Sequence, residues 1–168
     1  MRKQKGFSLI ELLIVVAIIL IIAAIAIPNL LRARIAANES SAASIVRTLN
    51  TAEVSYVTSY PSTGYSASMA LLGGTCNATI PPTDQAACLI DDTLATTGGS
   101  TGKSGYKFTE AGAGTPAGTY LVTAMPSAAG SSGVNAFCSV EDAVVRKDST
   151  GVGATDNASC QAFASLGN

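Results

Sequence analysis

The sequence predicts an α+β protein in which one long N-terminal helix packs on a small antiparallel β-sheet head domain. Three observations support this. A nearly pure apolar stretch runs from Phe7 to Ile27, and a helical apolar periodicity continues to Tyr60. β-forming stretches between glycine-rich turns fill the remainder of the 168 residues. The chain has room for one domain of ordinary size with an appendage.

Composition excludes several function classes before any motif is considered. Charged residues make up 12% of the chain, against roughly 25% in average globular proteins, and hydrophobic residues make up 48%. The absence of His excludes Ser-His-Asp and Cys-His catalysis and imidazole metal sites. With 10 Lys+Arg against 11 Asp+Glu, there is no basic excess for nucleic acid. We therefore expect lipid or protein partners, no cofactor and no enzymatic activity.

The first six residues carry three of the ten positive charges and no acid, a pattern that favours the cytoplasmic side of a membrane. Between Phe7 and Ile27 the only polar side chains are Ser8 and Glu11. A helix of that length measures roughly 30 Å, the thickness of a bilayer's hydrocarbon core. We expect residues 7–27 to span a membrane once. A cleaved signal peptide is the competing interpretation, but the run exceeds the roughly 7 to 15 residues of such a core.

Beyond Pro28 the helix is expected to continue to residue 60, so that residues 28–60 pack on the head and Pro61 ends the helix. Apolar residues recur there at spacings of three, four or seven, which indicates one apolar face. The expected face comprises Leu31, Ile35, Ala42, Ile45, Leu49, Ala52, Tyr56 and Tyr60. The residues expected mostly off it are Arg32, Arg34, Asn38, Glu39, Arg47 and Glu53.

Residues 61–168 are expected to form a disulfide-containing, β-rich globular head that buries one sheet face against the helix. A hairpin turn at Glu141 and Asp142 would join the last two expected strands. The strands are expected at Gly105 to Thr109, Thr119 to Met125, Asn135 to Val140 and Ala143 to Lys147.

All four cysteines, Cys76, Cys88, Cys138 and Cys160, follow the apolar segment. An even number of cysteines without histidine indicates two disulfides in an oxidising compartment, and three connectivities are possible. We favour Cys76 with Cys88 and Cys138 with Cys160. A four-thiolate zinc site is the alternative, although the paired C-x2-C spacing typical of such sites is missing.

Glu11 is a carboxylate placed inside the apolar stretch, which makes it a functional candidate by default. No Lys or Arg lies between Gly6 and Arg32 to neutralise it. Cleavage between Gly6 and Phe7 would create an α-amine four residues before Glu11, able to pair with it in the same or a neighbouring chain. The alternative is that Glu11 snorkels to the lipid headgroups.

The run from Lys5 to Ile19, with Ala24-Ile25-Ala26-Ile27-Pro28 after it, resembles the N-terminus of type IV prepilins. The resemblance rests on a short basic leader ending in Gly6, then Phe7, Glu11 and Pro28. It covers about the first third of the chain closely. It implies the pilin fold, and a structural subunit of a type IV pilus that serves adhesion or motility.

The resemblance also implies how the subunit is processed and assembled. A membrane-embedded prepilin peptidase would cut after Gly6 and methylate Phe7, which changes the formal net charge from -1 to -4 because the leader takes three positive charges with it. An inner-membrane assembly platform would lift the subunit into a helical homo-oligomer. Glu11 would dock each newcomer on a neighbour's amine, and the helix would kink or loosen at Pro28. A disulfide between Cys138 and Cys160 would staple the C-terminal region.

Three alternatives stay open. The first is a pseudopilin of a type II secretion system, which shares the N-terminal features. In that case the assembled filament would be a periplasmic pseudopilus and not an extracellular pilus. Asp142, Asp148 and Asp156 are weak calcium candidates, because their spacing matches no EF-hand loop. A membrane-anchored enzyme or binding domain would need a polar constellation in residues 61–168, and the nearest motif, Thr97 to Ser104, lacks the first glycine of a phosphate-binding loop.

Overall fold

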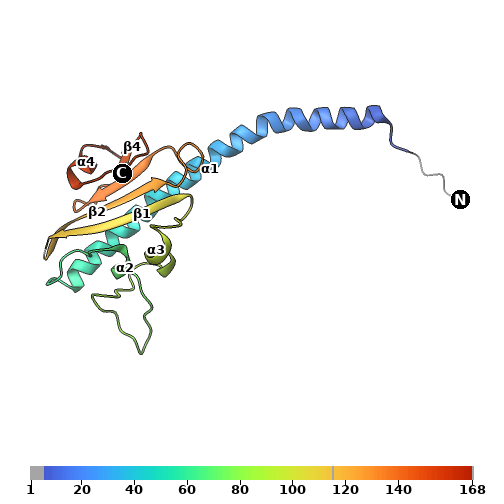
Figure 1. Cartoon of the computed structure of the whole chain (residues 1–168). Helices are drawn as coiled ribbons and strands as arrows, with labels where there is room; N and C mark the ends of the chain where they lie inside the picture. The colour runs from blue at the N-terminus through green and yellow to red at the C-terminus, as the bar shows by residue number, and fades with distance from the viewer. Residues whose placement is uncertain (1–5, 115, 168) are drawn as a thin grey trace. The chain divides into compact units, whose positions relative to one another are not determined.

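The computed structural model describes residues 6–114 and 116–167, and it divides into two compact units. One ends at Arg34 and the other, the head, begins at Ile35. Helix α1, Leu9–Ser59, runs unbroken through Pro28 and contributes residues to both units (Figure 1). The long helix and the sheet described below form the α+β architecture that the sequence predicted.

The head contains one antiparallel sheet whose five strands lie in sequence order. Every strand therefore pairs with its neighbours along the chain. The strands are β1 Tyr106–Gly114, β2 Ala117–Pro126, β3 Ala136–Val140, β4 Arg146–Asp148 and β5 Ala164–Ser165. Three short helices accompany them: α2 Met69–Leu72, α3 Asp92–Thr97 and α4 Asn157–Gln161 (Figure 1).

The core lies between one face of α1 and the inner face of the sheet. Side chains on α1 at spacings of three and four are buried, because these positions share one side of a helix. On β1 alternate residues are buried, as the two-residue period of a strand requires. The main contributors are Ala42, Val46, Leu49, Ala52 and Tyr56 from α1, and Tyr106, Phe108, Tyr120 and Val122 from the sheet.

Two expectations for α1 need correction. Glu53 was expected on the solvent side of the helix, but it is fully buried. Ile45 was expected on the buried face, but Val46 is fully buried instead and Ile45 only partly. Ile45 and Val46 are adjacent in the sequence, and the helical periodicity is compatible with either of them on the buried face. The shape of the sheet decides which of the two it covers.

The expected strand over residues 143–147 is also shifted, since β4 begins at Arg146. Ala143 has a positive φ of 56°, which is incompatible with a strand. The amide of Val144 donates to Asp142 Oδ1 at 3.0 Å, so a side chain takes the place of a ladder partner. The turn at Asp142 thus consumes residues that β-propensity alone assigns to the strand.

The two disulfides join Cys76 to Cys88 and Cys138 to Cys160, with Cα–Cα distances of 6.1 Å and 5.9 Å. This is the pairing that the sequence analysis favoured. Cys138 and Cys160 are fully buried and tie β3 to α4, beneath Phe163 and Leu121. Because all four cysteine sulfurs are paired in disulfides, none is available as a thiolate ligand for zinc.

Candidate processing and assembly segment

The segment that carries the predicted cleavage site lies at the start of the N-terminal unit. Gly6 and Phe7 precede α1, and the Phe7 side chain is 78% exposed. A peptidase can reach a scissile bond that is exposed and lies outside regular secondary structure. The other residues of the predicted leader, 1–5, lie outside the described part of the chain.

The apolar side chains that follow are exposed around the helix. Large apolar residues between Leu9 and Leu31 are 45% to 75% exposed. By length and composition, α1 can cross a membrane. Apolar surface of this extent is unstable in water, so lipid or another protein chain must cover it.

Glu11 also has a local role that the sequence analysis missed. The backbone amide of Ser8 donates to Glu11 Oε2 at 3.0 Å. Ser8 and Glu11 have the S-x-x-E spacing of a capping box, in which a carboxylate in the first turn satisfies a free amide at the helix start. The positive end of the helix dipole stabilises the same charge. The motif was present in the sequence and could have revealed this contact.

Pro28 lies within α1 without ending it. Proline has no amide hydrogen, so the carbonyl of Ala24, one turn earlier, receives no bond from it. The missing bond weakens the helix locally, in a segment whose neighbours Ile27 and Leu30 are exposed. The kink predicted at Pro28 stays a prediction.

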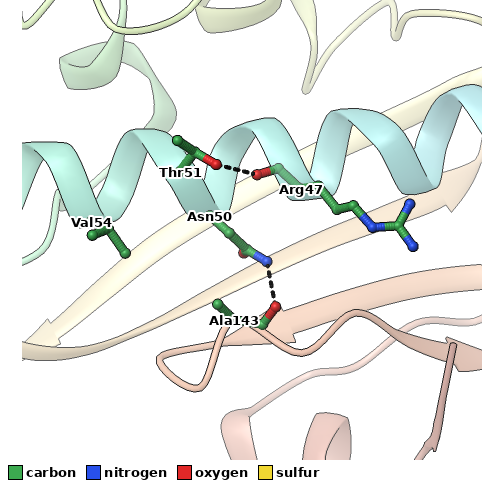
Figure 2. A pocket seen from close by; sticks show the side chains of 5 residues that line it. All are labelled: Arg47, Asn50, Thr51, Val54 and Ala143. Atoms are coloured by element: carbon green, nitrogen blue, oxygen red, sulfur yellow. Dashed lines mark hydrogen bonds between the residues drawn. The ribbon is translucent and has the colours of Figure 1, made fainter. Parts of the chain in front are cut away.

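The head carries an open groove of about 320 Å³ between α1 and the turn that follows β3 (Figure 2). Its lining residues are Arg47, Asn50, Thr51, Val54 and Ala143. The Asn50 amide already donates to Ser139 Oγ at 2.9 Å and to the Ala143 carbonyl at 3.1 Å. Arg47 is the one charged residue of this lining, so the groove brings together no set of catalytic groups.

The three aspartates named as weak calcium candidates serve separate local roles. Asp142 pairs with Arg146, and the interaction holds the pKa of Asp142 below its ordinary value. Asp148 accepts from Thr150 and from the Gly153 amide, and Asp156 caps α4. Within the described residues no three carboxylate or cysteine side chains gather in a metal-binding cluster. The structure therefore does not bring these aspartates together.

Comparison with known proteins identifies the N-terminal segment. Residues 1–27 match the family described as the prokaryotic N-terminal methylation motif. The chain carries the prokaryotic N-terminal methylation motif. The matched segment contains Gly6, Phe7 and Glu11, which are described above.

One relative is the type IV wide pilus major component PilA4 of Thermus thermophilus, 68% identical over 40 residues. The type IV major pilin protein PilA of Myxococcus xanthus is 48% identical over 54 residues. These matches cover 24% and 32% of this chain, and 30% and 24% of the relatives. The chain thus aligns with less than a third of either relative. No solved structure matches the chain.

Proposed function

We propose that this pilin-type chain is a structural subunit of a type IV pilus. Prepilin peptidase would cut between Gly6 and Phe7 and methylate the new amine of Phe7. The subunit would wait in the inner membrane as a single-pass protein, and an assembly platform would then move it into an extracellular filament. The observation that carries this proposal is the exposed apolar surface of residues 7–31 on a helix with the methylation motif.

The membrane and the filament would both shield this apolar surface from water. Lipid covers the apolar side chains before assembly, and neighbouring copies of the same helix cover them in the filament. The Glu11 carboxylate would meet the amine of an adjacent subunit. In an apolar environment such a pair must offset its desolvation, so it is better suited to setting the register between subunits than to adding stability.

The decisive experiment is intact-mass analysis and peptide mapping of protein sheared from the surface of cells. We expect a chain that begins at Phe7 and carries one methyl group. An intact residue 1, or cleavage after Ala26, would refute the processing step. Correctly processed protein found only in the periplasm would point to a secretion pseudopilin in place of a pilus.

A second arm tests the docking role of the carboxylate. Glu11→Gln should leave cleavage intact and lower the yield of sheared filaments at least tenfold, because the charge that attracts the amine is gone. Asp92→Asn, which removes an exposed charge from the head, is the matched control. Normal filament yield from Glu11→Gln would show that docking does not depend on this carboxylate.

A further inference from the structure

Two carboxyl side chains face each other in the head, between α1 and β1. Glu53 on α1 is fully buried, and Glu110 on β1 is 7% exposed. Glu110 follows Tyr106 and Phe108 on the inner face of the strand, so the alternation of β1 directs it toward the helix. Neither position is explained by the proposed pilus function.

Only one of the two carboxyls has visible partners. The Ser66 amide and hydroxyl donate to the two oxygens of Glu53 at 3.0 Å and 2.6 Å. Both oxygens of Glu110 are buried without a hydrogen-bond partner. Buried polar atoms of this kind are rare, and each one calls for a physical explanation.

Among the described residues, the other titratable side chains that interact with the pair bring no positive charge. They are Tyr56 from α1 and Tyr120 from β2, and, besides burial, the charge of Glu53 contributes to raising the pKa of both. The ion pairs in the described part of the chain, Lys103 with Asp91 and Arg146 with Asp142, involve neither glutamate.

Two adjacent ionised carboxylates without a cation are very unfavourable in a protein interior. Burial, and next the charge of Glu53, raise the pKa of Glu110 to about 9. Glu110 is thus the member of the pair that holds a proton at neutral pH. Glu53 is the member whose two oxygens already accept hydrogen bonds, both from Ser66.

We propose that Glu53 and Glu110 share one proton across the contact between α1 and β1, and that this proton makes the folding of the head sensitive to pH. With the proton present, Glu110 donates toward the Glu53 carboxylate and the two elements are joined. Without it, two negative charges face each other and the helix is pushed away from the strand.

The direction of the effect follows from proton binding. Between pH 4.5, the ordinary pKa of a glutamate, and about 9, the folded head holds a proton that the unfolded chain has lost. Rising pH therefore favours unfolding throughout this interval. The ratio of folded to unfolded protein should fall by up to about tenfold per pH unit, and the dependence should end above the folded pKa.

The test is thermal or urea unfolding of the full chain in detergent, followed by near-UV circular dichroism between pH 5 and pH 9.5. Glu110→Gln mimics the protonated side chain and should remove most of the slope, so that the variant gains on the wild type as pH rises. Asp92→Asn should keep the wild-type slope. Equal slopes for the wild type and Glu110→Gln would overturn the proposal.

A second measurement needs no variant. The infrared carbonyl band of a protonated carboxylic acid should be present in the folded wild-type chain at pH 7 and should disappear in the alkaline range. A spectrum at pH 7 without this band would overturn the proposal even if Glu110→Gln failed to fold.

Discussion

Asn50 shows how much of the head depends on one side chain. It is 4% exposed and lies on the sheet-facing side of α1. Its amide nitrogen donates to Ser139 Oγ on β3 and to the Ala143 carbonyl, and the Tyr120 hydroxyl of β2 donates to its oxygen at 3.2 Å. A single amide thereby joins the helix to two strands and a turn.

Replacing Asn50 should therefore be costly. Asn50→Leu fills a similar volume but removes three buried or part-buried hydrogen bonds, those to Ser139, Ala143 and Tyr120, which should lower the free energy of unfolding by about 2–3 kcal/mol. Urea unfolding of the full chain in detergent measures the loss. Thr51→Ala removes one exposed hydroxyl bonded only within the helix, at 3.1 Å to Arg47, and should change stability by less than about 0.5 kcal/mol. Similar values for the two variants would contradict the assigned role of Asn50.

Among the elements, α4 is the one whose place depends most on a covalent link. It has five residues, too few for a stable helix alone, and a capping box from Asp156 begins it. Cys160 within it is bonded to Cys138 of β3, and both are fully buried. The disulfide and the cap together fix the C-terminal segment on the outer face of the sheet.

The two disulfides should therefore differ in their contribution. Cys138→Ala with Cys160→Ala opens a loop with a sequence separation of 22 and leaves a buried cavity, which should lower the free energy of unfolding by about 2–4 kcal/mol. Cys76→Ala with Cys88→Ala, at partly exposed positions, should cost less. Unfolding curves of both double variants provide the comparison. A larger loss from the second pair would refute this ranking.

The elements also differ in how far sequence alone predicts them. α1 is predictable because a long apolar period repeats along it, and β2, β3 and the first part of β1 because β-formers lie between turns. The second part of β1, residues 110–114, was not predicted, because Ala and Gly there are poor β-formers. The short helices were not predicted, since they are set by caps and packing more than by periodicity. Glu53 was misplaced because a carboxylate in an apolar interior contradicts the usual preference. Its burial depends on two hydrogen bonds from Ser66, a residue beyond the helix that periodicity does not place beside it. The capping contact in which Glu11 accepts from the Ser8 amide could have been predicted from the spacing of the two residues.

At the scale of the whole chain, exposed apolar surface is unevenly distributed. The N-terminal unit exposes nearly every large apolar residue it has, from Phe7 to Leu31. In the head, exposed large apolar residues are scattered singly, which is ordinary for a soluble domain. They are Val54, Ile80, Leu89, Val134, Val144 and Val152.

This distribution predicts different behaviour for the two units in solution. A fragment of residues 35–168 should be a soluble, cooperatively folded monomer without detergent, because the head has its own core. The full chain should aggregate unless detergent or lipid covers residues 7–31. Analytical ultracentrifugation of both proteins, with and without detergent, measures this. Aggregation of the fragment would contradict this prediction, because it would show that the head also has an apolar surface that must be covered.

The sequential order of the strands bears on how the head forms as the chain emerges, N-terminus first. Each strand pairs with the strand made just before it, from β1 through β5. No strand has to be inserted between two that have already paired, so the sheet can grow in the order of synthesis. Local pairing of this kind lowers the loop-closure cost of each step and favours rapid folding. The last helix, α4, then arrives on four paired strands, where Cys160 meets Cys138, and β5 adds to β4 after it.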